Sequence, residues 1–182
     1  MLAKEISLPK ALHELHGERT RLSTLALVYL AGLAAAGVVA WQLLSAGLAA
    51  WQIALASLLF LDIGGGVVAN LSTSTNQYYQ RKPGLRVTFL LLHILQPALL
   101  ALAFSAVLPY TIFTAGFTLG TALLVNTAKD TEFQQNIAAA LLTGGICLSF
   151  LFALPHPVLY AFAPLFMIKL ILGFAVRRPA FC

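Results

Sequence analysis

The stretch WQIALASLLFLDIGGGVVANLSTSTNQYYQ, residues 51–80, combines an apolar run with one carboxylate and a polar tail. Asp62 interrupts the apolar run, and three glycines and a series of Asn, Ser and Thr residues follow it. The other acids lie outside the apolar runs, at Glu5, Glu14, Glu18, Asp130 and Glu132. Because an ionised carboxylate in hydrocarbon is costly unless it is paired, hydrated or protonated, Asp62 marks a candidate functional site.

Helical spacing places Asp62 on one continuous stripe with Gly66, Ala69, Thr73 and Asn76, and Asn70 on a polar row beside it. Such a stripe could line a water-filled groove. Alternatively, Gly64, Gly65 and Gly66 allow close approach of another helix, and Asp62 satisfies that neighbour. For the Ser and Thr residues the sequence favours a structural role, because their hydroxyls often bond to their own backbone.

The composition indicates a membrane protein. The chain has 182 residues, of which 60% are hydrophobic and 9% charged, whereas soluble domains carry about 25% charged residues. The formal charge of +5 does not indicate nucleic-acid binding, because the basic residues lie at the ends of apolar segments, where they orient a chain in a bilayer. We therefore expect a lipid bilayer as the partner.

Six apolar segments of roughly 20 residues could each cross a hydrocarbon core of about 30 Å. They cover residues 24–44, 50–71, 85–108, 110–126, 137–154 and 158–176. The chain is thus predicted to be all-α, with a six-helix transmembrane domain over residues 24–178. Leucines near helical spacing in residues 1–23 predict a short amphipathic interfacial helix, and residues 179–182 form a C-terminal tail.

The basic residues predict the orientation of these segments. They occur before segment one, between two and three, between four and five, and after six: Lys4, Lys10, Arg19, Arg21, Arg81, Lys82, Arg86, Lys129, Arg177 and Arg178. The intervening connections carry none. By the positive-inside rule both termini are cytoplasmic, in a multi-pass protein of a bacterial-type inner membrane.

Counting along the helices brings several polar residues to similar depths. Asp62 lies 11 residues from Trp51, and Lys169 lies 11 residues from Val158, so both fall near mid-membrane. Lys169 either pairs with Asp62 or extends along its apolar stem to the cytoplasmic interface. The sequence favours the second arrangement, since desolvation of a buried pair can exceed its attraction.

Further polar groups lie in the cytoplasmic half of the predicted bundle. Pro97 cannot donate to the carbonyl of His93, so a free carbonyl, an imidazole and the Gln96 amide coincide there. Asn126 ends the fourth segment. These positions predict a vestibule that opens to the cytoplasm and binds a small polar solute or cation through Asp62, His93, Gln96, Asn70, Thr73, Asn76, Asn126 and Lys169.

Three functions fit this pattern. The first is a small transporter or channel, because intramembrane acids and histidines commonly serve proton or ion pathways. The second is a membrane-embedded enzyme that acts on a lipid or apolar substrate at the cytoplasmic interface, with Asp62 and His93 as acid and base, or as metal ligands. A catalytic metal usually needs three protein ligands, and the third would have to be an Asn, Glu132 or a distant residue, so no metal site is predicted. The third is a non-catalytic membrane subunit.

Neither a cofactor nor a family follows from the sequence. The chain has no Walker loop, HExxH, GxSxG or CxxC motif. A bis-histidine haem is not expected, because His93 is the one histidine within the apolar segments. Glycine-rich helix faces, including the Gly116 and Gly120 pair, would permit a homo-oligomer.

Overall fold

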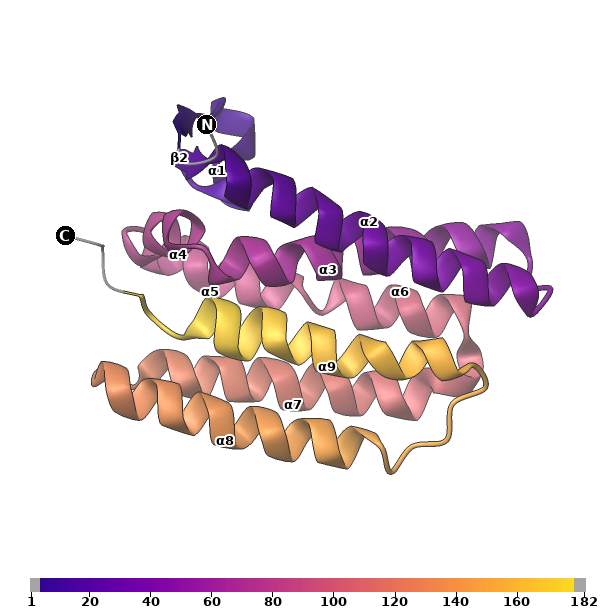
Figure 1. Cartoon of the computed structure of the whole chain (residues 1–182). Coiled ribbons are helices and arrows are strands. Elements are labelled where there is room, and N and C mark those ends of the chain that lie inside the picture. The colour runs from indigo at the N-terminus through magenta and orange to yellow at the C-terminus, as the bar shows by residue number, and fades with distance from the viewer. Residues whose placement is uncertain (1–3, 179–182) are drawn as a thin grey trace.

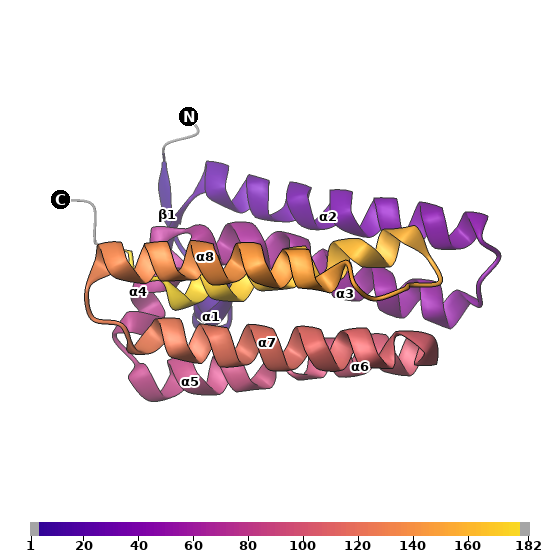
Figure 2. The same cartoon turned by 90° about the horizontal axis from the view of Figure 1, so that it is seen from below.

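The computed structural model describes residues 4–178, which form an elongated bundle of helices (Figure 1). The structure is 81% helical and belongs to the all-α class. Its long helices run side by side along one axis, as both views show (Figures 1 and 2). The first strand, helix α4 (Thr73–Gln80) and the end of the last helix lie at the same end of the bundle (Figures 1 and 2).

Five helical segments are long and apolar enough to cross a membrane. They are α2 (Leu22–Ser45), α3 (Ala50–Leu71), α5 with α6 (Pro83–Leu92 and Leu95–Ala103), η2 with α7 (Ser105–Val107 and Leu108–Thr127), and the last helix. The last helix consists of η3 (Pro157–Ala161), α9 (Phe162–Met167) and a π-helix, η4 (Ile168–Ala175). These helices correspond to five of the six predicted segments.

The remaining predicted segment, residues 137–154, corresponds to α8 (Thr131–Ser149). This helix begins earlier than expected because Asp130 caps it, with its side chain accepting from the Phe133 N–H at 2.7 Å. Its first turns are therefore polar, and α8 is not among the five apolar spans. It nevertheless lies beside α7 along the length of the bundle (Figures 1 and 2).

The N-terminal residues differ from the predicted amphipathic helix. They form β1 (Glu5–Ser7), η1 (Lys10–Leu12), the four-residue α1 (His13–His16) and β2 (Arg19–Arg21). β1 and β2 pair antiparallel. Gly17, with a φ of 75°, ends α1 in a conformation that favours glycine and turns the chain into β2. Residues 1–3 and the predicted tail, 179–182, lie outside the described residues.

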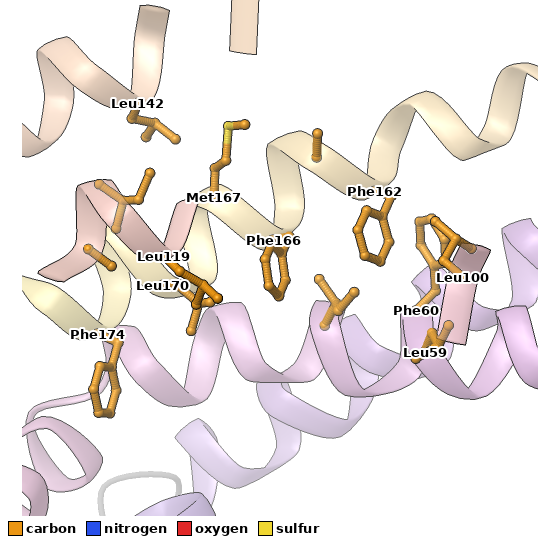
Figure 3. Packing of buried hydrophobic residues seen from close by; sticks show 14 of the residues in the cluster. Leu59, Phe60, Leu100, Leu119, Leu142, Phe162, Phe166, Met167, Leu170 and Phe174 are labelled. Carbon is orange, nitrogen blue, oxygen red and sulfur yellow. The ribbon is translucent and has the colours of Figure 1, made fainter. Parts of the chain in front are cut away.

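The last helix forms the core of the bundle. In the most apolar 18-residue stretch of each helix, 61% of the residues are buried in the last helix and 17% in α2. It contacts α3, α7 and α8 and runs between α3 and α7 in Figure 1. Figure 3 shows Phe162, Phe166 and Phe174 along it, with Met167 directed toward Leu142 of α8. A lysine at position 169 is therefore surrounded by protein on several sides.

Close packing of α2 on α3 depends on glycines. A Cβ atom at Gly32 would lie 2.7 Å from the Leu61 carbonyl oxygen, and one at Gly65 would lie 3.0 Å from the Val28 carbonyl oxygen. A Cβ atom at Gly64 would lie 2.8 Å from Cβ of Ala35. Without side chains at these positions the two backbones approach closely, as is common between membrane helices. The helix-contact interpretation is thus confirmed for Gly64 and Gly65.

Replacing Gly32 by alanine is expected to lower the free energy of unfolding by about 1–3 kcal/mol, because the new methyl group overpacks a backbone contact. Gly37 on the same helix has nothing within 4 Å of its would-be Cβ. Gly37→Ala is therefore a matched control that leaves stability unchanged or raises it by up to about 1 kcal/mol. Unfolding in mixed detergent micelles, followed by circular dichroism, measures both. Equal effects of the two substitutions would contradict the assigned contact.

Candidate functional site

An ion pair joins the middle of α3 to the last helix. The Nζ atom of Lys169 lies 2.8 Å from Oδ2 of Asp62. The lysine side chain is 3% exposed and the aspartate side chain 47% exposed. The preference for a lysine that extends to the interface was therefore wrong. Lys169 lies on the most enclosed helix, and its ammonium group meets a carboxylate at its own depth.

Gly66 makes room for this lysine. A Cβ atom at position 66 would lie 2.4 Å from Cε and 2.9 Å from Nζ of Lys169. Because Gly66 follows Asp62 by one helical turn, the lysine stem crosses the glycine and ends at the carboxylate. The three consecutive glycines therefore have two uses. Gly64 and Gly65 admit α2, and Gly66 admits the lysine.

Gln96 binds the same carboxylate oxygen as Lys169. The helix containing it breaks between α5 and α6, where Pro97 interrupts the hydrogen-bond pattern. After this break Gln96 Nε2 donates to Oδ2 of Asp62. Within residues 4–178, Oδ1 of Asp62 accepts no hydrogen bond, and the buried Oε1 of Gln96 has no partner. Oδ1 of Asp62 and the buried Oε1 of Gln96 are thus two acceptor oxygens without a protein partner among the described residues.

His93 lies at the same break, buried against the ring of Phe89 at 4.3 Å between centroids. Its Nδ1 lies 2.7 Å from the Phe89 carbonyl oxygen, so Nδ1–H donates there and Nε2 carries the ring's lone pair. The carbonyl of His93 accepts from the Gln96 N–H at 3.3 Å. The expected free carbonyl is therefore not free.

A groove of about 320 Å³ connects these groups. Its polar lining comprises Asp62, Asn70, His93, Gln96 and Lys169, and its apolar lining includes Phe89, Leu92 and Leu95. Glu14 and Leu15 of the N-terminal segment also border it. Five of the eight predicted site residues therefore meet in one small void.

Thr73, Asn76 and Asn126 do not line this groove. The predicted stripe assumed one continuous helix from Asp62 to Asn76, but α3 ends at Leu71. Ser72 caps the new helix α4 (Thr73–Gln80), accepting from the Thr75 N–H at 3.3 Å and donating to the Ala69 carbonyl at 2.6 Å. This break turns the later residues away from the stripe, and Thr73 borders a separate cavity at the end of the bundle.

Asn76 instead caps the C-terminus of the last helix. Its Nδ2 donates to the Val176 carbonyl at 2.8 Å and to the Gly173 carbonyl at 3.3 Å. Its Oδ1 accepts from the Arg178 N–H at 3.0 Å and from Gln80 at 2.6 Å. Asn70 donates to the carbonyl of Lys169 at 3.2 Å. The Asn76 amide thus satisfies carbonyl groups that a helix end leaves without partners, and the Asn70 amide bonds to a carbonyl inside the helix.

The sequence analysis missed Arg86, which completes this cap. Its Nη2 donates to the carbonyls of Phe174 and Ala175 at 2.5 and 3.0 Å, and its Nε donates to Oδ1 of Asn126 at 2.6 Å. Arg86 is 4% exposed, and a cation near a helix C-terminus is favourable. Its place one turn after Pro83, inside an otherwise apolar helix, was the available signal. Asn126 therefore supports an arginine.

The groove does not present a metal-ligand set. Within residues 4–178, no group of three or more His, Cys, Asp and Glu side chains lies close enough to hold a metal ion. Comparison with protein-family models, with curated proteins and with solved structures finds no match.

The cap predicts that Asn76→Ala lowers the free energy of unfolding by about 1–3 kcal/mol, because buried carbonyl and amide groups lose their partners. Asn136→Ala, at an exposed position on α8, is the matched control and should change stability by less than about 0.5 kcal/mol. Detergent-titration unfolding reports both values. An equal loss in the free energy of unfolding for Asn136→Ala and Asn76→Ala would contradict the assigned cap.

Proposed function

We propose that the chain is a small six-span membrane transporter in which Asp62 binds a cation or a proton in exchange with the ammonium group of Lys169. The observation that carries this proposal is the half-exposed carboxylate of Asp62, which borders a groove and binds Lys169 and Gln96 through one oxygen only. The carboxylate binds the transported cation. Lys169 supplies the counter-charge when the site is empty.

The energetics of the pair support exchange. A buried ion pair contributes little net stability, yet removal of one partner leaves an uncompensated buried charge. Lys169 is almost fully enclosed, and the carboxylate of Asp62 is its partner. A cation at Oδ1, or a proton on the carboxylate, weakens the attraction between Asp62 and the ammonium group of Lys169. Binding of one positive charge is thereby coupled to displacement or deprotonation of that ammonium group.

The groove also has the chemistry for a small cationic solute. Two oxygen acceptors, Asp62 Oδ1 and Gln96 Oε1, lie without protein partners among the described residues, and apolar groups of Phe89, Leu92 and Leu95 surround them. A void of about 320 Å³ accommodates an ion with water or a small organic cation. Glu14, at the border with the N-terminal segment, adds a negative charge at one end of the groove.

The proposed topology has six spans, with both termini on the cytoplasmic side of a bacterial-type inner membrane. We assign α8 as the remaining span because it packs against α7 and the last helix and has exposed apolar side chains, including Phe133 and Leu148. Six passes return the chain to the end at which it began. The basic residues then all face one side.

Self-association is a further part of the proposal. Gly116 and Gly120 are exposed on α7, and neither would-be Cβ atom has anything within 4 Å. A flat face of this kind allows a second helix to approach closely. We assign it to contact between copies of the chain, away from the groove.

The transport proposal is tested in proteoliposomes loaded with a pH-sensitive dye. Opposing gradients of Na⁺, K⁺ or methylammonium should drive proton movement through the wild-type protein. Asp62→Asn should abolish this flux, because a neutral amide cannot bind the cation or exchange a proton. Glu132→Gln, which removes an exposed carboxylate from the first turn of α8, should leave it unchanged.

Two results contradict the proposal. The first is an unchanged flux in Asp62→Asn, with the variant correctly folded by circular dichroism and size-exclusion chromatography. The second is the absence of flux above protein-free liposomes for the wild type with all three cations. The enzyme and subunit interpretations would then take precedence.

A further inference from the structure

A second cavity, separate from the Asp62 groove, lies at the end of the bundle where the N-terminal segment meets α2, α3 and α4. Its volume is about 850 Å³. Four arginines and two glutamates border it, which gives its lining a net charge of +2: Arg19, Arg21, Arg81, Arg178, Glu5 and Glu18. The transport proposal does not use this cavity, and Thr73 is the one predicted site residue on its lining.

These arginines have no acidic partner within the described residues. The one ion pair found in residues 4–178 joins Lys169 to Asp62. Arg178 donates through Nη2 to the Leu172 carbonyl at 3.2 Å, but its buried Nη1 has no partner. Burial lowers the pKa of Arg178 below its ordinary value, as expected for a guanidinium without a counter-charge. The cavity therefore has an excess of positive charge, and neither of its glutamates forms an ion pair with an arginine.

Hydroxyl groups add further donors to the lining. Thr20 is 5% exposed and borders the cavity. Thr73 and Thr24 also border the cavity. Guanidinium groups together with hydroxyls form the donor set that phosphate oxygens prefer, because both give charge-assisted or direct hydrogen bonds to a tetrahedral anion.

The cavity is polar on one side and apolar on the other. Leu27 of α2, with Val68 and Leu71 of α3, borders it within the membrane-spanning helices. Leu27 is 57% exposed. The arginines come from outside those helices: Arg19 and Arg21 belong to β2, Arg81 directly follows α4, and Arg178 lies three residues after the end of the last helix. This division matches the level at which a lipid headgroup meets its acyl chains.

The geometry points to a binding site for a phosphate-bearing anion at this cavity, with Arg19, Arg21, Arg81 and Arg178 as the charged donors and Thr20 and Thr73 as hydroxyl donors. The ligand is either the headgroup of an anionic phospholipid, with its chains along Leu27, or a soluble phosphate. The bound anion joins the N-terminal segment to α4. Ser74, which donates to the Arg19 carbonyl, already links these parts directly.

Native mass spectrometry of the full chain in detergent tests this site. The probes are dioleoyl phosphatidylglycerol, dioleoyl phosphatidylcholine and inorganic phosphate. The wild type should bind phosphatidylglycerol about tenfold or more tightly than phosphatidylcholine, and the Arg19→Gln/Arg81→Gln double variant should lose that preference. Both arginines are exposed, so the double variant is expected to fold. Circular dichroism and an unfolding midpoint check this.

Lys129→Gln is the matched control, because Lys129 carries the same charge between α7 and α8 and does not border the cavity. It should retain the preference for phosphatidylglycerol. Displacement of the lipid by millimolar inorganic phosphate would identify a soluble phosphate as the ligand, and retention of the lipid would identify the headgroup. Equal binding of both lipids with no phosphate bound, or equal losses in Lys129→Gln and the double variant, would overturn the proposal.

Discussion

The ion pair between Asp62 and Lys169 constrains the centre of the bundle. Lys169 lies on the helix with the greatest burial, so its charge needs a partner at its own depth. That requirement explains the position of Asp62 in an apolar helix and the absence of a side chain at Gly66. The break at Pro97 between α5 and α6 then brings Gln96 to the same carboxylate oxygen. The groove results from these four positions together.

A second polar layer fixes the end of the same helix. The carbonyls of residues 172–176 accept hydrogen bonds from Asn76, Arg86 and Arg178. A π-helix leaves more carbonyls without internal partners at its end than an α-helix does, because its bonds span five residues rather than four. The polar side chains are therefore concentrated there. Lys169 lies at the start of the π-helix, so the cap also sets the position of the ion pair.

The sequence predicted much of the architecture, because length and apolar character determine membrane spans. It also predicted that Asp62 and Lys169 share a depth, since rise per residue is constant in a helix. It did not distinguish pairing from extension of Lys169 to the interface, because that choice depends on which helix lies at the centre. The stripe through Thr73 and Asn76 was wrong since Ser72 ends α3. The sequence indicated only that Arg86 helps to orient the chain in the membrane, because the carbonyls to which it donates lie far along the chain.

Solid-state NMR in lipid bilayers measures the central contact directly. Protein labelled with ¹⁵N at lysine Nζ and ¹³C at aspartate Cγ has one close pair among the described residues, because Asp62 and Lys169 form the single ion pair found there. The account predicts strong dipolar dephasing, consistent with the 2.8 Å contact between Nζ and Oδ2, and its loss in Asp62→Asn. Wild-type protein without dephasing, or dephasing that survives in Asp62→Asn, would contradict the ion pair and the exchange site built on it.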